Sequence, residues 1–291
     1  MENSHNVEAL REAIEEDFRE VRDPAGRRVN VVDDGALKVL SERFGCSVGV
    51  VVQEAMGMGG WPLRYLRNIG SFTLAEQLML ARSKVAVVGA GGLGGHVIML
   101  LARTGTGHLT VIDHDCFDET NLNRQQLATT AALGRSKARE AARAVAAVNP
   151  CATVVAKKER LTATNAERLL GGAQLVVDAL DTVSDRLIIS DVCRRLGVPL
   201  VHGALAGFAG QVMSVFPTDP GLCLIYGREV PEENREMAAE AVLGVPALTP
   251  AIIGTFQAME VIKILLDRGQ ALRNTMLHMD LENGELNRFR F

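Results

Sequence analysis

The stretch from Val85 to Gly95 constrains the fold of this chain more than any other. Residues 85–88 form a short, mostly β-branched apolar run that leads directly into Gly-Ala-Gly-Gly-Leu-Gly-Gly, and apolar residues then recur at helical spacing at positions 97, 100 and 101. This order predicts a strand, a glycine turn and a helix. Glycines suit the turn because the backbone must bend sharply and let a phosphate approach the N–H groups at the start of the helix. The glycines expected at this phosphate site are Gly89, Gly91, Gly92 and Gly94.

A carboxylate follows the next apolar run. Residues 109–112 form a second expected strand, and Asp113 stands directly after it, 24 positions beyond Gly89. A carboxylate at this place accepts the ribose hydroxyls of a bound nucleotide in a dinucleotide-binding architecture. The sequence therefore predicts an adenine-nucleotide site, and an NAD-dependent oxidoreductase remains open at this point.

The polar residues that follow Asp113 favour a triphosphate. A dinucleotide presents only a pyrophosphate, whereas a triphosphate needs its charge neutralised while it is cleaved. Two cations and two amides after the ribose carboxylate suit that task. These residues, together with one further acid, are Asp115, Asn121, Arg124, Gln125 and Lys137.

Strand and helix patterns alternate beyond Lys137, which predicts a parallel sheet with right-handed crossovers. The expected fold class is α/β: a Rossmann-like, mainly parallel sheet with helices on both faces, antiparallel strands toward the C-terminus and a small helical N-terminal extension. Further strands are expected at 153–156, 175–177, 200–202, 211–216, 276–280 and 286–291, and further helices at 137–148, 163–170 and 251–266. A small-residue stretch at 203–210 and a polar loop at 217–246 are expected between them.

The first 60 residues are expected to form a helical extension, and residues 61–291 the main domain. Leu10, Ile14, Phe18 and Val21 share one face of an expected helix, and two shorter helices follow at 35–44 and 48–56. Two helices joined by a short turn are also typical of DNA-binding proteins. However, residues 1–60 contain 7 basic and 12 acidic side chains, which would repel a phosphate backbone. A cap on the main domain or a partner-binding segment is the favoured interpretation.

The motifs occur in one order and together resemble the adenylylating family that includes MoeB, ThiF and HesA, the bacterial relatives of ubiquitin-activating enzymes. The resemblance covers roughly residues 62–291, and the order is more specific than any single motif. The matching pieces are RYLRNI from Arg64, GAGGLGG from Gly89, DHD from Asp113, NLNRQ from Asn121, GRSK ending at Lys137, DALD from Asp178 with Arg186 following, PLVHGALAGFAGQV from Pro199, and TFQAMEVIKILL from Thr255.

The resemblance implies ATP-dependent adenylylation of the C-terminal glycine carboxylate of a ubiquitin-like sulfur-carrier protein, with release of pyrophosphate. The carrier is expected to end in Gly-Gly, and ATP and Mg²⁺ are the expected cofactors. A carboxylate of ordinary pKa, about 3.5, is already ionised at neutral pH, so no general base is needed. The carrier itself and its pathway are left open.

The resemblance also implies a role for each site residue. Asp113 would hold the ribose, and Asp181 the magnesium that bridges the phosphates. Asn121 and Gln125 would orient the phosphates, while Arg124, Lys137 and Arg67 would stabilise their charge. The second arginine of RYLRNI, which is Arg67 here, would reach from one subunit of a homodimer into the nucleotide site of its partner.

The chain departs from the family pattern at three places. Thr182 stands where relatives usually have Asn after the second Asp of DALD. The places of two zinc-binding CxxC pairs contain one thiol, Cys223, so no zinc site is expected. Cys223 is also the only candidate near the crossover loop for a thiol that receives the carrier, and a buried role is expected for it. A dehydratase-like or non-catalytic member that acts on another carbonyl or carboxylate is the alternative.

Three further expectations follow from composition. No apolar run was expected to reach the length of a membrane span, and the acidic N-terminus lacks a leader pattern, which predicts a soluble cytoplasmic protein. The five cysteines form no CxxC pair and are expected to be reduced, mostly buried thiols. A net charge of −4 gives no reason to expect nucleic acid as a partner. We expect His202 to be a packed strand residue and Asp178 to cap a helix. A terminal hairpin is expected to turn at Asn283-Gly284.

Overall fold

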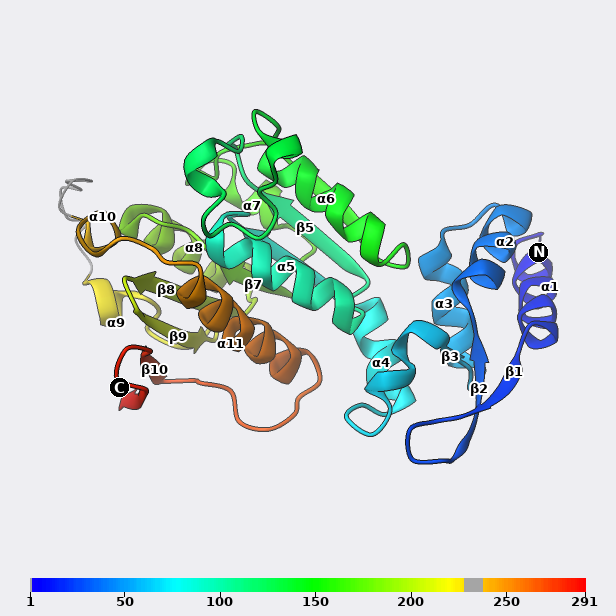
Figure 1. Ribbon diagram of the computed structural model, residues 1–291. Helices are drawn as coiled ribbons and strands as arrows, with labels where there is room; N and C mark the ends of the chain where they lie inside the picture. Colours follow the sequence, from blue (N-terminus) through cyan, green and yellow to red (C-terminus); the bar gives the residue numbers. More distant parts are fainter. Residues whose placement is uncertain (1, 228–237) are drawn as a thin grey trace. The chain divides into compact units, whose positions relative to one another are not determined.

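A computed structural model describes residues 2–227 and 238–291 of the chain, which divides into two compact units (Figure 1). The first unit consists of Met1–Ser83, Ala102–His108 and Ala146–Thr153. The second consists of Lys84–Leu101, Leu109–Val145 and Val154–Phe291. Residues 61–83 therefore cluster with the N-terminal segment in space, although the functional division at residues 60 and 61 stays a prediction.

The helices of the first unit begin and end where local signals place them. Gly45, with a φ of +63°, ends the second helix in the left-handed conformation that glycine favours. The hydroxyl of Ser47 accepts a hydrogen bond from the backbone N–H of Val50 and so caps the third helix. Both short helices that the sequence predicts are therefore confirmed. The unit contains α1 (Glu2–Glu16), α2 (Asp34–Phe44), α3 (Val48–Gly57), η1 (Leu63–Asn68) and α4 (Leu74–Arg82).

A three-stranded sheet in this unit corrects the predicted N-terminal helix. The helix ends at Glu16, and β1 (Arg19–Arg22), which contains Val21, pairs antiparallel with β2 (Arg28–Val32). The chain turns because a carboxylate oxygen of Asp23 accepts the backbone N–H groups of Ala25 and Arg27, at 2.8 and 2.9 Å. β3 (Trp61–Pro62) joins β2 in parallel. The glycine-rich segment 57–61, for which the sequence predicts a linker, therefore ends in a strand.

The second unit is built on an eight-stranded sheet in the order β11-β10-β9-β8-β7-β4-β5-β6. β4 pairs in parallel with β7, and β7 with β8, whereas β8, β9, β10 and β11 pair antiparallel. This confirms the predicted fold class. The strands are β4 (Lys84–Val88), β5 (His108–Ile112), β6 (Thr153–Lys157), β7 (Leu175–Asp178), β8 (Leu200–Ala206), β9 (Ala209–Val215), β10 (Thr275–Asp280) and β11 (Glu285–Arg290).

The predicted small-residue stretch 203–210 forms most of the hairpin between β8 and β9. Glycine is required there because a neighbouring helix packs against the strands. A Cβ on Gly203 would lie 2.4 Å from Cδ of Gln257, and one on Gly210 would lie 2.5 Å from Cγ1 of Ile253.

The helices of this unit largely follow the prediction, with two additions. The sequence also predicts mobility for the polar loop at 217–246, and the short helices α9 (Cys223–Tyr226) and α10 (Ala239–Leu243) lie within it. Residues 228–237 of that loop lie outside the described residues. The predicted helix at 163–170 begins later, at Ala166. The others are α5 (Gly92–Thr104), η2 (Glu119–Asn121), η3 (Thr130–Ala132), α6 (Lys137–Val148), α7 (Ala166–Leu170), α8 (Val183–Leu196) and α11 (Leu248–Leu265).

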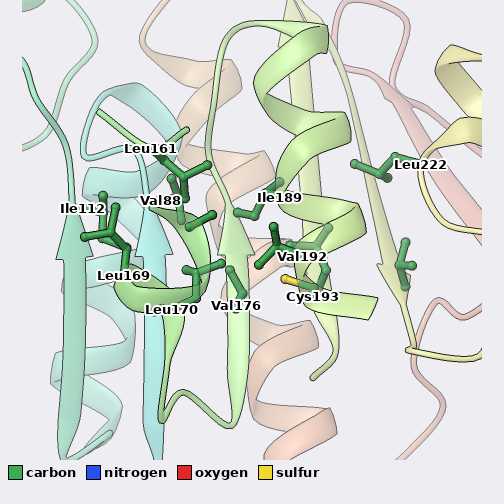
Figure 2. Packing of buried hydrophobic residues seen from close by; sticks show 14 of the residues in the cluster. Val88, Ile112, Leu161, Leu169, Leu170, Val176, Ile189, Val192, Cys193 and Leu222 are labelled. Atoms are coloured by element: carbon green, nitrogen blue, oxygen red, sulfur yellow. The ribbon is translucent and has the colours of Figure 1, made fainter. Parts of the chain in front are cut away.

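Helices cover both faces of this sheet. Figure 2 shows side chains of α7 and α8, among them Leu169 and Ile189, packed over Val88, Ile112 and Val176 of the strands, and all five are almost fully buried. On the other face, α11 packs against β7, β8 and β9, and its Gly254 lies close to the backbone of α5. The sheet edge where β4, β5 and β7 end is thereby left open to a ligand.

One helix differs from the expectation that no apolar run is long enough to cross a membrane. α11 has 18 residues and a mean hydropathy of 1.3. Half of it is buried inside the protein, including Ile253 and Val261. Its contacts with three strands are those of a core helix.

The cysteines are free thiols, as predicted, but they are not mostly buried. Cys151 and Cys193 are buried, which raises the pKa of Cys151 to about 11 and that of Cys193 to about 12. Cys46 and Cys223 are partly exposed and Cys116 is exposed. Because Cys223 is only partly buried, its expected buried role is wrong. Its Sγ lies 3.0 Å from the carbonyl oxygen of Pro220.

A buried polar pair joins β7 to β8. Asp178 and His202 are paired in the register of the two strands, both are 0% exposed, and Oδ2 of Asp178 lies 2.7 Å from Nδ1 of His202. Burial lowers the pKa of His202, although the hydrogen bond and the charge of Asp178 act in the opposite direction. His202 is therefore a hydrogen-bonded strand residue, as predicted, and is neutral at neutral pH.

The close contact between Gly94 and the glycine turn predicts a large effect of one methyl group. A Cβ on Gly94 would lie 1.8 Å from the carbonyl oxygen of Gly89. We expect Gly94→Ala to lower the free energy of unfolding by about 2 kcal/mol or more, measured by urea titration. Gly57→Ala is the control, because nothing lies within 4 Å of its Cβ position. Equal stability of the two variants would contradict this packing.

The neutral state of His202 predicts a dependence of stability on pH. Its folded-state pKa lies below the unfolded value of about 6.5, so the unfolded chain binds the proton first as the pH falls. The free energy of unfolding should therefore fall below about pH 6.5, by up to about 1.4 kcal/mol per pH unit from this residue. His202→Asn, which keeps a donor for Asp178, should flatten this slope in urea titrations. An unchanged slope in His202→Asn would refute the assignment.

Candidate active site

The carboxyl ends of the central strands surround an open cavity of about 330 Å³. Its lining comes from the turn after β4, the end of β5, the segment before α6 and the end of β7. The structure thus brings together predicted site residues that lie up to 92 positions apart in the sequence, from Gly89 to Asp181. The predicted site residues that line it are Gly89, Gly91, Gly92, Asp113, Asp115, Arg124, Gln125, Lys137 and Asp181.

The glycine turn forms one wall of this cavity and leaves no room for a side chain at Gly89. Gly89 has a φ of +94°, and a Cβ there would lie 2.4 Å from the carbonyl oxygen of Ala179. A Cβ on Gly91 would approach the amide of Gln125 to 3.5 Å. The turn can therefore place its backbone directly against a ligand, as a phosphate-binding turn must.

Asp113 is held by the turn that it faces. Its Oδ2 accepts the backbone N–H of Ala90 at 2.7 Å, and its Oδ1 accepts that of Asp115 at 2.8 Å. Burial raises the pKa of Asp113, while these two hydrogen bonds and the charge of Lys137 act in the opposite direction. Each oxygen keeps a second lone pair, so the carboxylate can still accept two ribose hydroxyls.

Two cations and an amide also line this cavity. The Nζ of Lys137, at the first position of α6, donates to Oδ2 of Asp115 at 3.1 Å, and the residue is only 7% exposed. Arg124 donates to the carbonyl oxygen of Thr120 at 2.8 Å and is half-buried. The Oε1 of Gln125 is buried and has no hydrogen-bond partner among the described residues. An unpaired buried acceptor in a cavity indicates a missing ligand or ordered water.

The turn after β7 carries Asp181 into the cavity. Asp181 is exposed, and Thr182 next to it caps α8 through the backbone N–H of Asp185, at 3.3 Å. Thr182 therefore performs the capping that the sequence assigns to Asp178. The carboxylate of Asp178 instead accepts the N–H of Leu180 at 3.0 Å and contacts His202.

Three predicted residues do not line the cavity. Asn121 is buried, and its Oδ1 accepts the backbone N–H of Asp118 at 3.2 Å in the cap of η2. Gly94 packs against the backbone of Gly89. Arg67 is an exposed residue of η1 in the first unit, whereas the other arginine of that motif, Arg64, binds Asp34 at 2.5 Å.

A second cavity of about 730 Å³ shares part of its lining with the first. Five residues belong to both, from the β7 turn, α8, β8 and α10. Small side chains of the hairpin between β8 and β9 form one wall, and Gln211, Tyr226 and His278 add polar groups. The shared residues are Asp181, Thr182, Arg186, Leu205 and Glu240.

Several lining residues were not singled out from the sequence. Glu159 and Arg160 follow β6, and their position just after a strand of the central sheet is a signal that could have identified them. His114 forms with its two neighbours a group of side chains whose ligand atoms lie within 4.8 Å of one another, the only such group of His, Cys, Asp and Glu side chains in the described part of the chain. It contains no thiol, and the absence of a zinc site stays a prediction.

The profile of the ThiF family matches residues 65–291 of the chain. Among curated proteins, a SAMP-activating enzyme E1 of Haloferax volcanii is 40% identical over 202 residues, which cover 69% of this chain and 74% of that protein. A sulfur carrier protein adenylyltransferase of Thermus thermophilus is 39% identical, covering 70% and 77%. An adenylyltransferase and sulfurtransferase MOCS3 of Arabidopsis thaliana is 36% identical, covering 75% of this chain and 47% of that longer protein. The chain thus spans about half the length of the MOCS3 proteins that it matches.

The fold of this chain is also found in solved structures. The structure of Escherichia coli MccB with ATP superimposes with a TM-score of 0.63 and 20% identity, covering 78% of this chain and 70% of that one. The same enzyme with AMPCPP and MccA superimposes with a TM-score of 0.68. With most of its length matched by the family profile and its glycine turn, acids and cations in one cavity, the chain belongs to the ThiF family.

Proposed function

We propose that this protein uses ATP to adenylylate the C-terminal glycine carboxylate of a ubiquitin-like sulfur-carrier protein that ends in Gly-Gly, with release of pyrophosphate. The observation that carries the proposal is the single cavity that gathers a glycine turn, a ribose-binding acid, two cations and a further acid. The relatives of the chain that are named adenylyltransferases support the same reaction class. The five free thiols suit the reducing cytoplasm, which is the proposed compartment.

ATP fits the donors and acceptors of this cavity. The backbone of Gly89 and Gly91 and the positive end of α5 would receive the phosphates, and Asp113 the ribose hydroxyls. The buried Oε1 of Gln125 has no hydrogen-bond donor among the described residues. A water molecule that also binds the nucleotide would donate a hydrogen bond to it. Lys137 is buried and already oriented by Asp115, so its charge needs little rearrangement when phosphates arrive.

The chemical step is attack by a carboxylate oxygen on the α-phosphorus of ATP. A bond forms between that oxygen and the α-phosphorus, and the bond from the α-phosphorus to the bridging oxygen of pyrophosphate breaks. The attacking carboxylate carries no proton at neutral pH, so no base is required. Lys137 and Arg124 would stabilise the negative charge that grows on the leaving pyrophosphate.

Asp181 is the proposed residue for Mg²⁺. It is an exposed carboxylate at the edge of the cavity, and magnesium commonly takes one or two protein carboxylates and fills its other positions with water and phosphate oxygens. When bound, the metal would neutralise phosphate charge. The oxygens of Asp113 already accept backbone N–H groups, which leaves Asp181 as the better candidate.

The second cavity is the proposed path for the carrier's C-terminal tail. It meets the nucleotide cavity at Asp181, and its wall includes Ala204, Ala206, Ala209 and Gly210. Such small side chains leave space beside the strands in which an extended tail can lie close to the backbone.

The proposed assembly is a homodimer in which Arg67 of each copy completes the nucleotide site of its partner. An exposed apolar stripe supports self-association, because Leu248, Ile252 and Met259 recur at helical spacing along α11 and are 66%, 38% and 50% exposed. A second copy of the same stripe is a self-complementary occupant under two-fold symmetry. An arginine supplied by a partner subunit would tie catalysis to the assembled dimer.

The proposed roles of Lys137 and Asp181 predict a specific loss of rate. We expect Lys137→Ala and Asp181→Asn each to lower the rate of adenylate formation by about 10²- to 10³-fold, measured as pyrophosphate release with ubiquitin-like carriers that end in Gly-Gly. Lys38→Ala, at an exposed position of α2, should retain the wild-type rate. Wild-type rates in both site variants would disprove the proposed roles. If the wild-type protein releases no pyrophosphate with any such carrier, the proposed function is wrong.

A mixing experiment tests the exchange of Arg67 between subunits. Arg67→Ala and Asp181→Asn should each be inactive alone, but mixed dimers would contain one complete site, so a mixture should recover about a quarter of the wild-type rate. The matched control is a mixture of Lys137→Ala with Asp181→Asn, in which each change disables the site of its own subunit, so the mixed dimers contain no complete site and should not be rescued. Equal rates in the two mixtures would exclude a shared site.

A further inference from the structure

Arg186 occupies the boundary between the two cavities. It lies on α8, is only 9% exposed and lines both cavities. Its Nε and Nη2 donate to the carbonyl oxygen of Leu180 at 3.2 and 2.6 Å, and its Nη1 donates to the hydroxyl of Tyr226 at 2.8 Å. A guanidinium group that is almost buried yet borders two cavities is well placed to bind an anion there.

The guanidinium group keeps donors for a ligand. It carries five N–H groups, and its contacts within the described residues account for three. One N–H remains on each terminal nitrogen, which matches the two oxygens of a carboxylate better than a single ammonium group would.

Tyr226 and His202 hold Arg186 in this place. The Nδ1–H of His202 donates to Asp178, so its Nε2 is an acceptor for the hydroxyl of Tyr226, at 3.2 Å. The tyrosine oxygen in turn accepts from Arg186 and from Nε2 of Gln211, at 2.8 and 3.3 Å. With these donors the tyrosine oxygen has no free lone pair with which to take a proton from a substrate. Tyr226 is thus a positioning residue.

Glu240 is the charged group that faces Arg186 from α10. It lines both cavities at the same boundary, and its negative charge acts on the guanidinium group. The larger charge effect on Arg186 comes from Asp178, but that carboxylate is buried and hydrogen-bonded to His202. Glu240 is thus the acid beside which a carboxylate entering from the second cavity would approach Arg186. The two carboxylates would therefore compete for the same cation.

We infer that Arg186 binds the carboxylate of the acyl substrate at the junction of the two cavities, and that Glu240 balances the charge of Arg186 until this substrate arrives. The inference rests on the proposed function, because that function requires a carboxylate to reach the nucleotide. It adds a residue that recognises the reacting group itself and a protein carboxylate that competes with it.

The test uses variants that should change the KM for the substrate in opposite directions. The probe is a ubiquitin-like carrier ending in Gly-Gly that supports pyrophosphate release by the wild-type protein. Arg186→Lys keeps the charge but loses the paired donors, and should raise the KM for the carrier about tenfold. Tyr226→Phe should raise it about threefold or more through misplacement of Arg186. Glu240→Gln removes the competitor and should lower it about threefold, and the KM for ATP should stay within about twofold throughout.

A matched control and defined contrary results complete the test. Glu285→Gln, in the exposed strand β11, should leave both KM values unchanged. If Arg186→Lys does not fold, Tyr226→Phe and Glu240→Gln still decide, because their predicted effects have opposite signs. An unchanged or raised KM for the carrier in Glu240→Gln, or an equal rise in the KM for ATP and carrier in Tyr226→Phe, would overturn the inference. Failure of the wild-type protein to use any such carrier would instead overturn the proposed function.

Discussion

The strands β4, β5 and β7 end at the same edge of one sheet, and the function of this chain depends on that edge. Parallel strands carry their carboxyl ends to one side, so the residues after each strand meet although they are far apart in the sequence. The glycine turn, Asp113 and Asp181 are such residues. Buried side chains of α7, α8 and α11 hold the strands from both faces and leave the edge itself open.

The polar groups at this edge are fixed before any ligand binds. Asp113 accepts backbone N–H groups of the turn it faces, Lys137 is oriented by Asp115, and Thr182 caps the helix beside Asp181. Below them, Asp178 and His202 join two strands through a fully buried contact. Charge stabilisation in a cavity is effective when the charged groups need not move. Between the nucleotide cavity and the second cavity, Arg186 donates hydrogen bonds to the carbonyl oxygen of Leu180 and to the hydroxyl of Tyr226.

The sequence predicted what depends on local signals and missed what depends on distant contacts. The glycine turn and the two capped helices of the first unit follow from residues next to one another, such as Ser47 and Val50. The hairpin of β1 and β2 was missed because the apolar residues up to Val21 also fit a helix, and only the turn at Asp23 decides between them. The motif predicts that Asn121 orients the phosphates, but its side chain accepts a backbone N–H in the cap of η2 and does not line the cavity. A motif alone does not determine where a side chain points. Tyr226 had no sequence signal, because its partner Arg186 lies 40 positions away.

The central claim is that a substrate carboxylate attacks the α-phosphorus of a nucleotide held at this sheet edge. Isotope transfer tests it most directly. A Gly-Gly carrier with ¹⁸O in its C-terminal carboxylate would be incubated with the protein, Mg²⁺ and ATP, with hydroxylamine present to cleave the acyl-adenylate at its carbonyl carbon. The account predicts that the AMP examined by mass spectrometry contains one ¹⁸O atom from the carrier, because the new bond joins that oxygen to phosphorus. AMP released in a carrier-dependent reaction without ¹⁸O would contradict the account.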